Sequence, residues 1–136
     1  MPRKCYALLA EQPLSALDTD AQQRDQIVVS AVVDDQGICQ TLSRYGDDTW
    51  ELWPFCEQAN LFPGDKRLLW SSTPRQFIEP VKASAYRFWK AGVNGQPLPS
   101  AKTMRGYVLN LRPFLRYLDK AGVKCLAAVR PIHISN

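Results

Sequence analysis

The hydrophobic residues in the first half of the chain follow patterns that are typical of β-strands. Residues 27–33 form a β-branched apolar run, residues 38–45 alternate in part, and residues 34–37 (Asp-Asp-Gln-Gly) between them have turn chemistry. Residues 49–55 form a third segment with apolar side chains on both faces, which Pro54 ends. The pattern predicts a hairpin followed by a third strand, together a small antiparallel meander.

The segments on either side of this meander are less regular. Residues 1–26 are polar and without a period, and they predict an irregular leader or a short helix around residues 21–26. Residues 66–70 (Lys-Arg-Leu-Leu-Trp) fit either a short strand or an aromatic plug. No function is assigned to either segment.

Apolar residues in the second half recur three and four positions apart, as on one face of an α-helix. A first helix is predicted over residues 73–91. Thr73 is its expected N-cap, with Gln76 placed to close a capping box. Pro80 is expected to separate a first turn from the main helix, and Gly92 to end it.

A second helix is predicted to start near Ser100 or Thr103 and to end at Gly122, because its apolar residues keep the helical period over four turns. Pro113 falls in its middle, where we expect a kink. Residues 131–136 resemble the opening of a further helix, which six residues cannot sustain alone. We therefore expect the chain to be cut before that helix is complete.

These segments together predict an α+β fold in two parts. A strand-rich leader domain takes residues 1–70, and a helical domain takes residues 71–136 and is truncated at its C-terminus. A chain of 136 residues, of which 46% are hydrophobic, is long enough to bury a core without disulfides or metals.

Composition excludes several classes of protein. The chain has no apolar run of 18 residues and no apolar segment near its start, so we expect neither a membrane span nor a secretory signal. Four cysteines stand far apart and the single histidine is isolated, so the sequence predicts no zinc site, no dense disulfide framework and no cofactor; these residues are Cys5, Cys39, Cys56, Cys125 and His133. A cytoplasmic location is the expectation that follows.

Charge divides the chain into an acidic and a basic half. Residues 1–70 hold 6 Lys and Arg against 11 Asp and Glu, whereas residues 71–136 hold 11 Lys and Arg against 2 acids. The balance is therefore −5 in the first half and +9 in the second, which gives the net +4 of the whole chain. Such a basic segment favours a polyanionic partner.

Basic residues gather on one side of each predicted helix. At 100° per residue, five cations of the second helix lie within an arc of about 80°; they are Lys102, Arg105, Arg112, Arg116 and Lys120. The first helix carries a similar flank, which contains Lys82, Tyr86, Arg87 and Lys90. Cations at one-turn spacing neutralise several phosphates at once, so the two helices predict a clamp for duplex DNA. The same residues also fit an ordinary solubilising surface.

Two tyrosines are expected to differ in exposure. Tyr107 lies within the apolar arc of the second helix, which predicts a place in the core, whereas Tyr86 lies on the basic flank and is a candidate DNA contact. Neither has the compact cluster of cations that a nucleophilic tyrosine needs. His133 is interpreted as a helix-start residue, and no catalytic residue is predicted.

Residues 100–134 resemble the core-binding domain of tyrosine recombinases and phage-type integrases. The matching positions follow in order as Thr103, the run Phe114-Leu115-Arg116-Tyr117-Leu118, Gly122, Leu126, Val129 and Pro131. Residues 77–92 look like the preceding helix of that domain, and residues 44–50 resemble the strand-rich leader of some larger integrases. The resemblance implies a helical, SAM-like module that grips one face of a recombination site. It implies DNA contacts at Lys82, Tyr86, Lys102, Thr103, Arg105, Arg112 and Arg116.

In that family a separate C-terminal domain exchanges the strands through a phosphotyrosine link, and its Arg, Lys, His-x-x-Arg and Tyr set is absent here. The resemblance therefore implies a non-catalytic DNA-binding fragment of a site-specific recombinase. Its expected partners are duplex DNA and other recombinase subunits, without a membrane or a small-molecule substrate. With Lys90 added from the first helix, the candidate DNA-binding residues are Lys82, Tyr86, Lys90, Lys102, Thr103, Arg105, Arg112 and Arg116.

A second hypothesis comes from a different class of function. The chain is then a non-catalytic protein-interaction or regulatory domain whose basic face meets an acidic partner. Aromatic residues of the meander supply the contact surface in this interpretation, because exposed aromatics favour protein interfaces; they are Trp50, Trp53 and Phe55.

Overall fold

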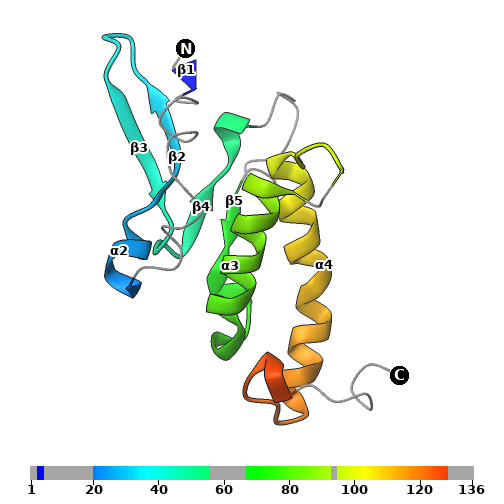
Figure 1. Ribbon diagram of the computed structural model, residues 1–136. Coiled ribbons are helices and arrows are strands. Elements are labelled where there is room, and N and C mark those ends of the chain that lie inside the picture. Colours follow the sequence, from blue (N-terminus) through cyan, green and yellow to red (C-terminus); the bar gives the residue numbers. More distant parts are fainter. Residues whose placement is uncertain (1–2, 5–19, 56–66, 93–94, 129–136) are drawn as a thin grey trace. The chain divides into compact units, whose positions relative to one another are not determined.

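The computed structural model describes residues 3–4, 20–55, 67–92 and 95–128 (Figure 1). The chain divides into two compact units, one made of residues 1–69 with 100–102 and the other of residues 70–99 with 103–136. The first unit holds the strands and the second holds most of two long helices, so the chain has the α+β fold that the sequence predicts.

The predicted hairpin is present in the first unit. Strands β2 (Val28–Val33) and β3 (Cys39–Arg44) pair antiparallel, and the short strand β1 (Arg3–Lys4) pairs with the other edge of β2. Asp34 organises the turn, because its Oδ1 accepts hydrogen bonds from the amides of Gln36 and Ile38, each at 2.9 Å.

The third strand differs from the predicted meander. Strand β4 (Thr49–Glu51) pairs antiparallel with β5 (Arg67–Leu69) in a separate two-stranded sheet, and not with β3. Trp50 lies opposite Leu68 in this sheet, and both side chains are fully buried. Residues 53–55 form a 3-10 turn, because Pro54 has no amide to continue a strand ladder. Residues 67–69 are thus a strand, which was one of the two expectations for that segment.

The core of the first unit gathers side chains from β2, β3, β4 and β5 and from the segments next to them. Ser30 on β2 and Ser43 on β3 are both buried, and their hydroxyl groups form a hydrogen bond with each other. The amide of Glu51 also donates to the Ser43 hydroxyl, at 3.2 Å, and so joins β4 to β3. Buried apolar side chains surround this polar contact; they are Ile27, Val29, Ala31, Val32, Tyr45, Trp50, Leu52 and Leu68.

A short helix precedes the hairpin, as one reading of the sequence predicted. Helix α2 (Ala21–Asp25) begins at Asp20, whose side chain accepts a hydrogen bond from the amide of Gln23 at 2.9 Å.

Helix α3 (Arg75–Ala91) starts differently from the predicted capping box. Its N-cap is Pro74, without a side-chain hydrogen bond, and Thr73 and Gln76 contact the second long helix instead. Pro80 lies inside a continuous helix, so the predicted break after the first turn is wrong. Near the start of a helix, proline leaves only one carbonyl without its usual partner. Gly92 ends the helix as predicted, with φ at +69°.

Helix α4 (Ala101–Lys120) runs without interruption across Pro113, where the sequence predicts a kink. The helix ends in a Schellman motif: the amide of Val123 donates to the carbonyl of Leu118, and that of Gly122 to the carbonyl of Asp119. Gly122 takes the left-handed backbone that this motif requires, with φ at +81°. A 3-10 turn over residues 126–128 follows, and the predicted helix over residues 131–136 lies outside the described residues.

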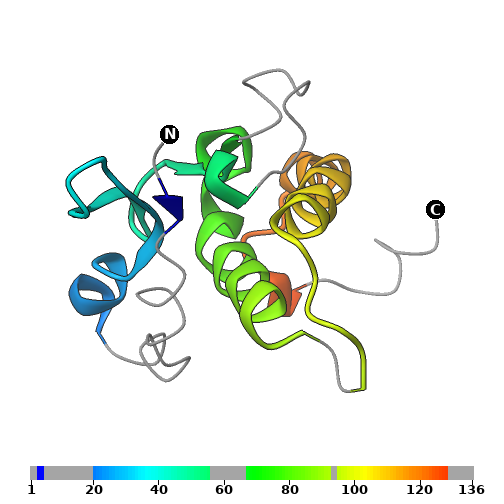
Figure 2. The ribbon, with the colours of Figure 1, turned by 90° about the horizontal axis from the view of Figure 1, so that it is seen from above.

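Helices α3 and α4 lie side by side and run antiparallel (Figures 1 and 2). Their buried apolar side chains form the core of the second unit, together with Val123 just after α4; those of the helices are Phe77, Val81, Ala85, Trp89, Met104, Val108, Leu115 and Leu118. Polar contacts join one end of the pair, because the Gln76 side-chain amide donates to Asp119 Oδ1 at 2.6 Å and to the carbonyl of Val123 at 3.3 Å.

The remaining expectations concern membrane spans, metal sites and cysteines. Within the described residues, no helix has the length and apolar character needed to cross a membrane, and no three metal-ligating side chains come together. Cys39 is disulfide-bonded, whereas Cys125 is an exposed free thiol. A disulfide is more typical of oxidising compartments, so this bond weighs against the cytoplasmic location inferred from cysteine spacing.

Candidate nucleic-acid interface

Two arginines of α4 lie close enough to Arg112 to affect its pKa. Burial lowers the pKa of Arg112 from its ordinary value, and the positive charges of Arg116 and Arg105 lower it further. Like charges exert such an effect only over short distances. The structure thus brings together Arg105, Arg112 and Arg116, which we call the arginine cluster, as the helical spacing predicts.

The turn before α3 fixes two members of the arginine cluster. Arg112 is 9% exposed, and its Nε donates to the hydroxyl of Thr73 at 3.4 Å. Arg116 donates from Nη2 to the carbonyl of Ser72 at 3.5 Å and is exposed. These contacts orient the guanidinium groups in advance, so less side-chain entropy is lost when an anion binds.

Other candidate residues of α4 extend this cluster along the helix. Lys102 and Thr103 in the first turn are exposed, as is Lys120 in the last, and Arg105 is half-buried. All belong to one continuous helix, so its geometry alone aligns the four basic residues other than buried Arg112. From Lys102 to Lys120 the helix rises about 27 Å, roughly eight base-pair steps of duplex DNA.

Two of the four residues of the predicted basic flank of α3 are buried. Lys82 is 3% exposed, with its Nζ 5.6 Å from the ring centroid of Trp70, and Tyr86 is 1% exposed. Burial also raises the pKa of Tyr86 above its ordinary value. The buried side chains of α3, from Phe77 round to Tyr86, span an arc of about 180°, wider than the single apolar stripe assumed from the sequence.

Lys90 keeps partial access to solvent, although it also lies among aromatic side chains. Its Nζ is 3.6 Å from the ring centroid of Trp89 and 6.0 Å from that of Tyr86. Burial lowers the pKa of Lys90 to about 8. A fraction of this amine is therefore neutral at slightly alkaline pH, which weakens any contact with a phosphate there.

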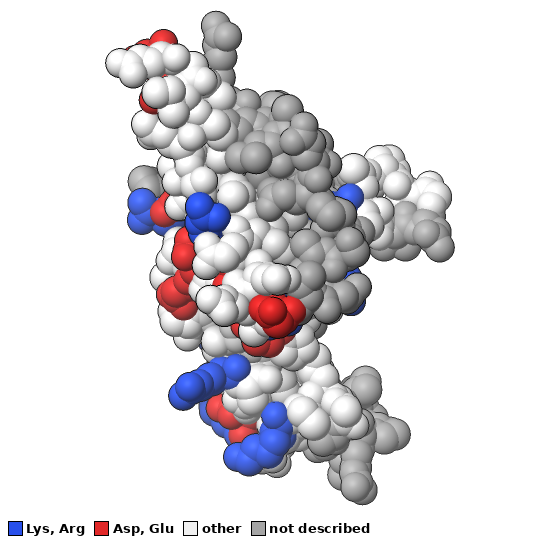
Figure 3. Space-filling model, turned by 60° about the vertical axis from the view of Figure 1, so that its left-hand side comes forward, with Lys and Arg blue, Asp and Glu red and all other residues white. Residues whose placement is uncertain are grey.

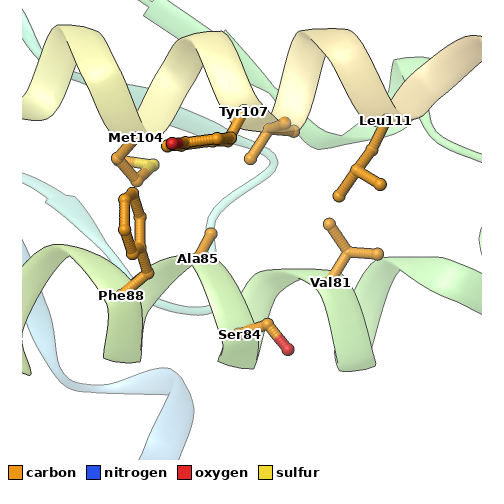
Figure 4. Close-up of a pocket in the computed structure, with 8 residues that line it drawn as sticks. Val81, Ser84, Ala85, Phe88, Met104, Tyr107 and Leu111 are labelled. Atoms are coloured by element: carbon orange, nitrogen blue, oxygen red, sulfur yellow. The ribbon is translucent and has the colours of Figure 1, made fainter. Parts of the chain in front are cut away.

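The tyrosine expected in the core is instead exposed. Tyr107 is 56% exposed and packs edge-on against Phe88, with ring centroids 4.8 Å apart. It belongs to an apolar groove of about 350 Å³ between α3 and α4, which the sequence analysis missed. The groove is lined by Val81, Ser84, Ala85, Phe88, Met104, Tyr107, Val108 and Leu111 (Figure 4). Tyr107 and Leu111 lie one turn apart in the apolar arc of α4, so spacing alone predicts that both are in the core and does not reveal the groove.

The arginine cluster is the feature of interest. On the face drawn in Figure 3, acidic and basic side chains of the described residues are interspersed. Guanidinium groups bind phosphate and carboxylate anions alike, so this cluster defines an anion-binding chemistry. Comparisons with models of protein families, with curated proteins and with solved structures find no match for this chain.

Proposed function

We propose that this chain binds duplex DNA through the basic row of α4, as a non-catalytic part of a site-specific tyrosine recombinase. The observation that carries the proposal is the arginine cluster, in which Arg112 and Arg116 are oriented by Thr73 and Ser72. Repulsion of the Arg112 guanidinium group by Arg105 and Arg116 is relieved when a polyanion supplies counter-charge. The resemblance of residues 100–134 to the core-binding domain supports the same function.

The contact set proposed here is narrower than the eight residues that the sequence indicates. Direct phosphate contacts are assigned to residues with exposed or half-buried side chains; they are Lys102, Thr103, Arg105, Arg116 and Lys120, with Lys90 as a weaker contributor. Arg112 positions the cluster from beneath. Burial of Lys82 and Tyr86 argues against a direct contact from either.

Several parts of the proposal follow from the resemblance alone. Strand exchange is assigned to another domain, so this chain by itself cuts no DNA, and other recombinase subunits are its proposed partners on the recombination site. The proposed location is the cytoplasm, where such DNA lies. There the Cys39 disulfide is expected to be reduced, and alkylation of free thiols in rapidly quenched cells tests this expectation.

Salt dependence of DNA binding tests the proposed function. We expect the full chain to bind a fluorescein-labelled duplex, with a log–log slope of affinity against salt of about −3.6 if four cations contact phosphates. Arg116→Ala and Arg105→Ala should each reduce this slope by about 0.9 in magnitude. Fluorescence anisotropy between about 50 and 200 mM NaCl measures both quantities.

Arg67→Ala is the matched control, because it removes the same charge from an arginine of the first unit whose side chain is 53% exposed. Circular dichroism of each variant checks that the fold is retained. The proposal is wrong if the wild-type chain shows no affinity at about 50 mM NaCl, or if Arg67→Ala weakens binding as much as Arg116→Ala.

The alternative is a protein-interaction domain for an acidic partner. Of its three expected aromatic contacts, Trp50 is fully buried in the sheet core and so is unavailable to a partner, whereas Trp53 is 37% exposed and Phe55 is half-buried. A different observation, the groove between α3 and α4, favours an interaction with protein.

A further inference from the structure

Helix α4 exposes an aromatic side chain beside its basic residues. Tyr117 is 39% exposed; it directly follows Arg116 and precedes Lys120 by three positions. At 100° per residue, Lys120 lies about 60° and Arg116 about 100° round the helix from Tyr117, both in the same direction. Residues three positions apart on a helix are neighbours on its surface. The ring of Tyr117 therefore borders the basic row of α4.

A second aromatic ring restricts the orientation of this tyrosine. Phe114, one turn earlier on α4, stacks against Tyr117 with ring centroids 6.4 Å apart and planes inclined by 28°. Phe114 is itself half-buried, so it is anchored in the fold. Because the contact limits the rotation of the Tyr117 ring while the residue stays exposed, less side-chain freedom is lost when a planar ligand stacks on that ring.

The exposed charges of α4 next to Tyr117 are positive. Arg116 and Lys120 are both exposed, and the helix contains a single acid, Asp119. Asp119 lies about 160° round α4 from Tyr117, and its Oδ1 accepts a hydrogen bond from the Gln76 side chain at 2.6 Å. A ligand at Tyr117 thus meets an aromatic ring and two cations, with no carboxylate of α4 on the same side.

This combination of groups suits a nucleotide whose base is unpaired. Proteins bind single-stranded nucleic acids by stacking bases on aromatic side chains while cations contact the backbone. In a paired duplex the neighbouring base pairs cover the faces of each base, so the duplex offers Tyr117 no surface for stacking. Arg116 and Lys120 lie one turn apart, about 6 Å along the axis, which lets them contact the phosphates on either side of one nucleotide.

We propose that Tyr117 stacks on an unpaired nucleobase of DNA bound to α4, while Arg116 and Lys120 hold the phosphates on either side of that nucleotide. The inference rests on the proposed DNA binding and specifies the form of DNA that the chain prefers, which is a duplex interrupted by an unpaired nucleotide. It adds Tyr117 to the contact set proposed above.

Two fluorescein-labelled duplexes of the same sequence serve as probes. One is fully paired, and the other has a single extra adenosine, unpaired, at its centre. We expect the full chain to bind the interrupted duplex at least about fivefold more tightly, which is the lower end of the effect of stacking on one base. With 2-aminopurine in place of the unpaired adenine, the fluorescence of that base should fall on binding, because stacking quenches it.

Two exposed tyrosines of α4 provide a matched pair of variants. Tyr117→Leu should abolish the preference for the interrupted duplex and leave the affinity for the paired duplex unchanged, whereas Tyr117→Trp should keep the preference. Tyr107→Leu is the control. Tyr107 is 56% exposed but lies about 140° round α4 from Lys120 and about 180° from Arg116, so the preference should persist. Circular dichroism checks that each variant keeps its fold.

Three results would overturn the inference. They are equal affinity of the wild-type chain for the two duplexes, a preference that survives in Tyr117→Leu, and a loss in Tyr107→Leu as large as that in Tyr117→Leu. If the paired duplex is still bound with the expected salt dependence, any of these results refutes stacking on Tyr117 alone. If neither duplex is bound, the inference and the proposed function are both wrong.

Discussion

Lys90 illustrates how one residue balances two opposing effects. Burial near the end of α3 disfavours its positive charge and lowers its pKa to about 8. The ring of Trp89, 3.6 Å from Nζ, attracts the same charge through a cation–π interaction. The charge is thus retained below pH 8 at a cost in stability that the ring partly offsets.

This balance predicts a pH dependence of stability. Between pH 8 and about 10.5 the folded chain has lost the Lys90 proton while the unfolded chain retains it, so the free energy of unfolding rises with pH in that window. The rise attributable to this group is at most about 3 kcal/mol. Urea unfolding of the wild type and of Lys90→Met at pH 7.5, 9 and 10 measures how much of the rise in the free energy of unfolding depends on Lys90. A parallel pH profile in the variant would contradict the prediction.

Arg112 is the residue whose position most affects the candidate site. Its aliphatic stem is buried beside the helix core while its Nε contacts Thr73. The same residue therefore packs the second unit and sets the orientation of the cluster. Thr73 therefore contacts Arg112 and does not cap α3, although the residues that follow it in the sequence predict a capping box.

At the scale of elements, one glycine ends α4 and another lies within it. Gly122 adopts φ of +81° in the Schellman motif that closes α4, where an L-residue is strained. Gly106 lies within α4, and a Cβ built there meets no atom within 4 Å. Gly106 thus lies within the helix, whereas Gly122 follows its last residue in a left-handed conformation.

This difference predicts opposite effects of the same substitution. Gly122→Ala should lower the free energy of unfolding by about 1 kcal/mol, because alanine disfavours the left-handed region. Gly106→Ala should raise it by about 0.5–1 kcal/mol through helix propensity and reduced freedom of the unfolded chain. Urea unfolding followed by circular dichroism compares the pair. Effects of the same sign would show that neither local argument holds.

Local patterns predict the elements better than their partners. The hairpin, the C-terminal ends of α3 and α4 and the single face of the arginine cluster all follow from spacing and turn residues within a few positions. The pairing of β4 with β5 does not, because its partner strand begins at Arg67, well beyond the turn that follows β4. A helical wheel predicts which side of α3 is apolar, but it does not predict how much of the helix surface other elements cover. The burial of Lys82 and Tyr86 could therefore not be predicted from it.

At the scale of the whole molecule, the basic half places like charges close together, which lowers the stability of the fold. Arg112 and Arg116 lie four positions apart on one helix, where like charges destabilise by a few tenths of a kcal/mol. Arg116 and Arg105 both lower the pKa of Arg112, which indicates that each repels the charge of Arg112. Such an arrangement is retained more readily where a polyanion offsets it.

Screening by salt should therefore stabilise the chain in the absence of DNA. We expect the free energy of unfolding to rise by on the order of 0.5 kcal/mol between about 20 and 300 mM NaCl. Arg116→Gln should reduce this rise, whereas Lys124→Gln, at an exposed lysine beyond α4, should reduce it less. Urea unfolding at several NaCl concentrations measures both. A rise that is identical in the two variants would remove the argument from local repulsion.

The polar contacts at one end of the helix pair have a mechanical consequence. Ser72, Thr73 and Gln76 hold Arg116, Arg112, Asp119 and Val123 through separate hydrogen bonds. A slide of α4 along α3 by one turn would break all of them together, so translation is strongly opposed. Any relative motion of the two helices should therefore be smallest at this end.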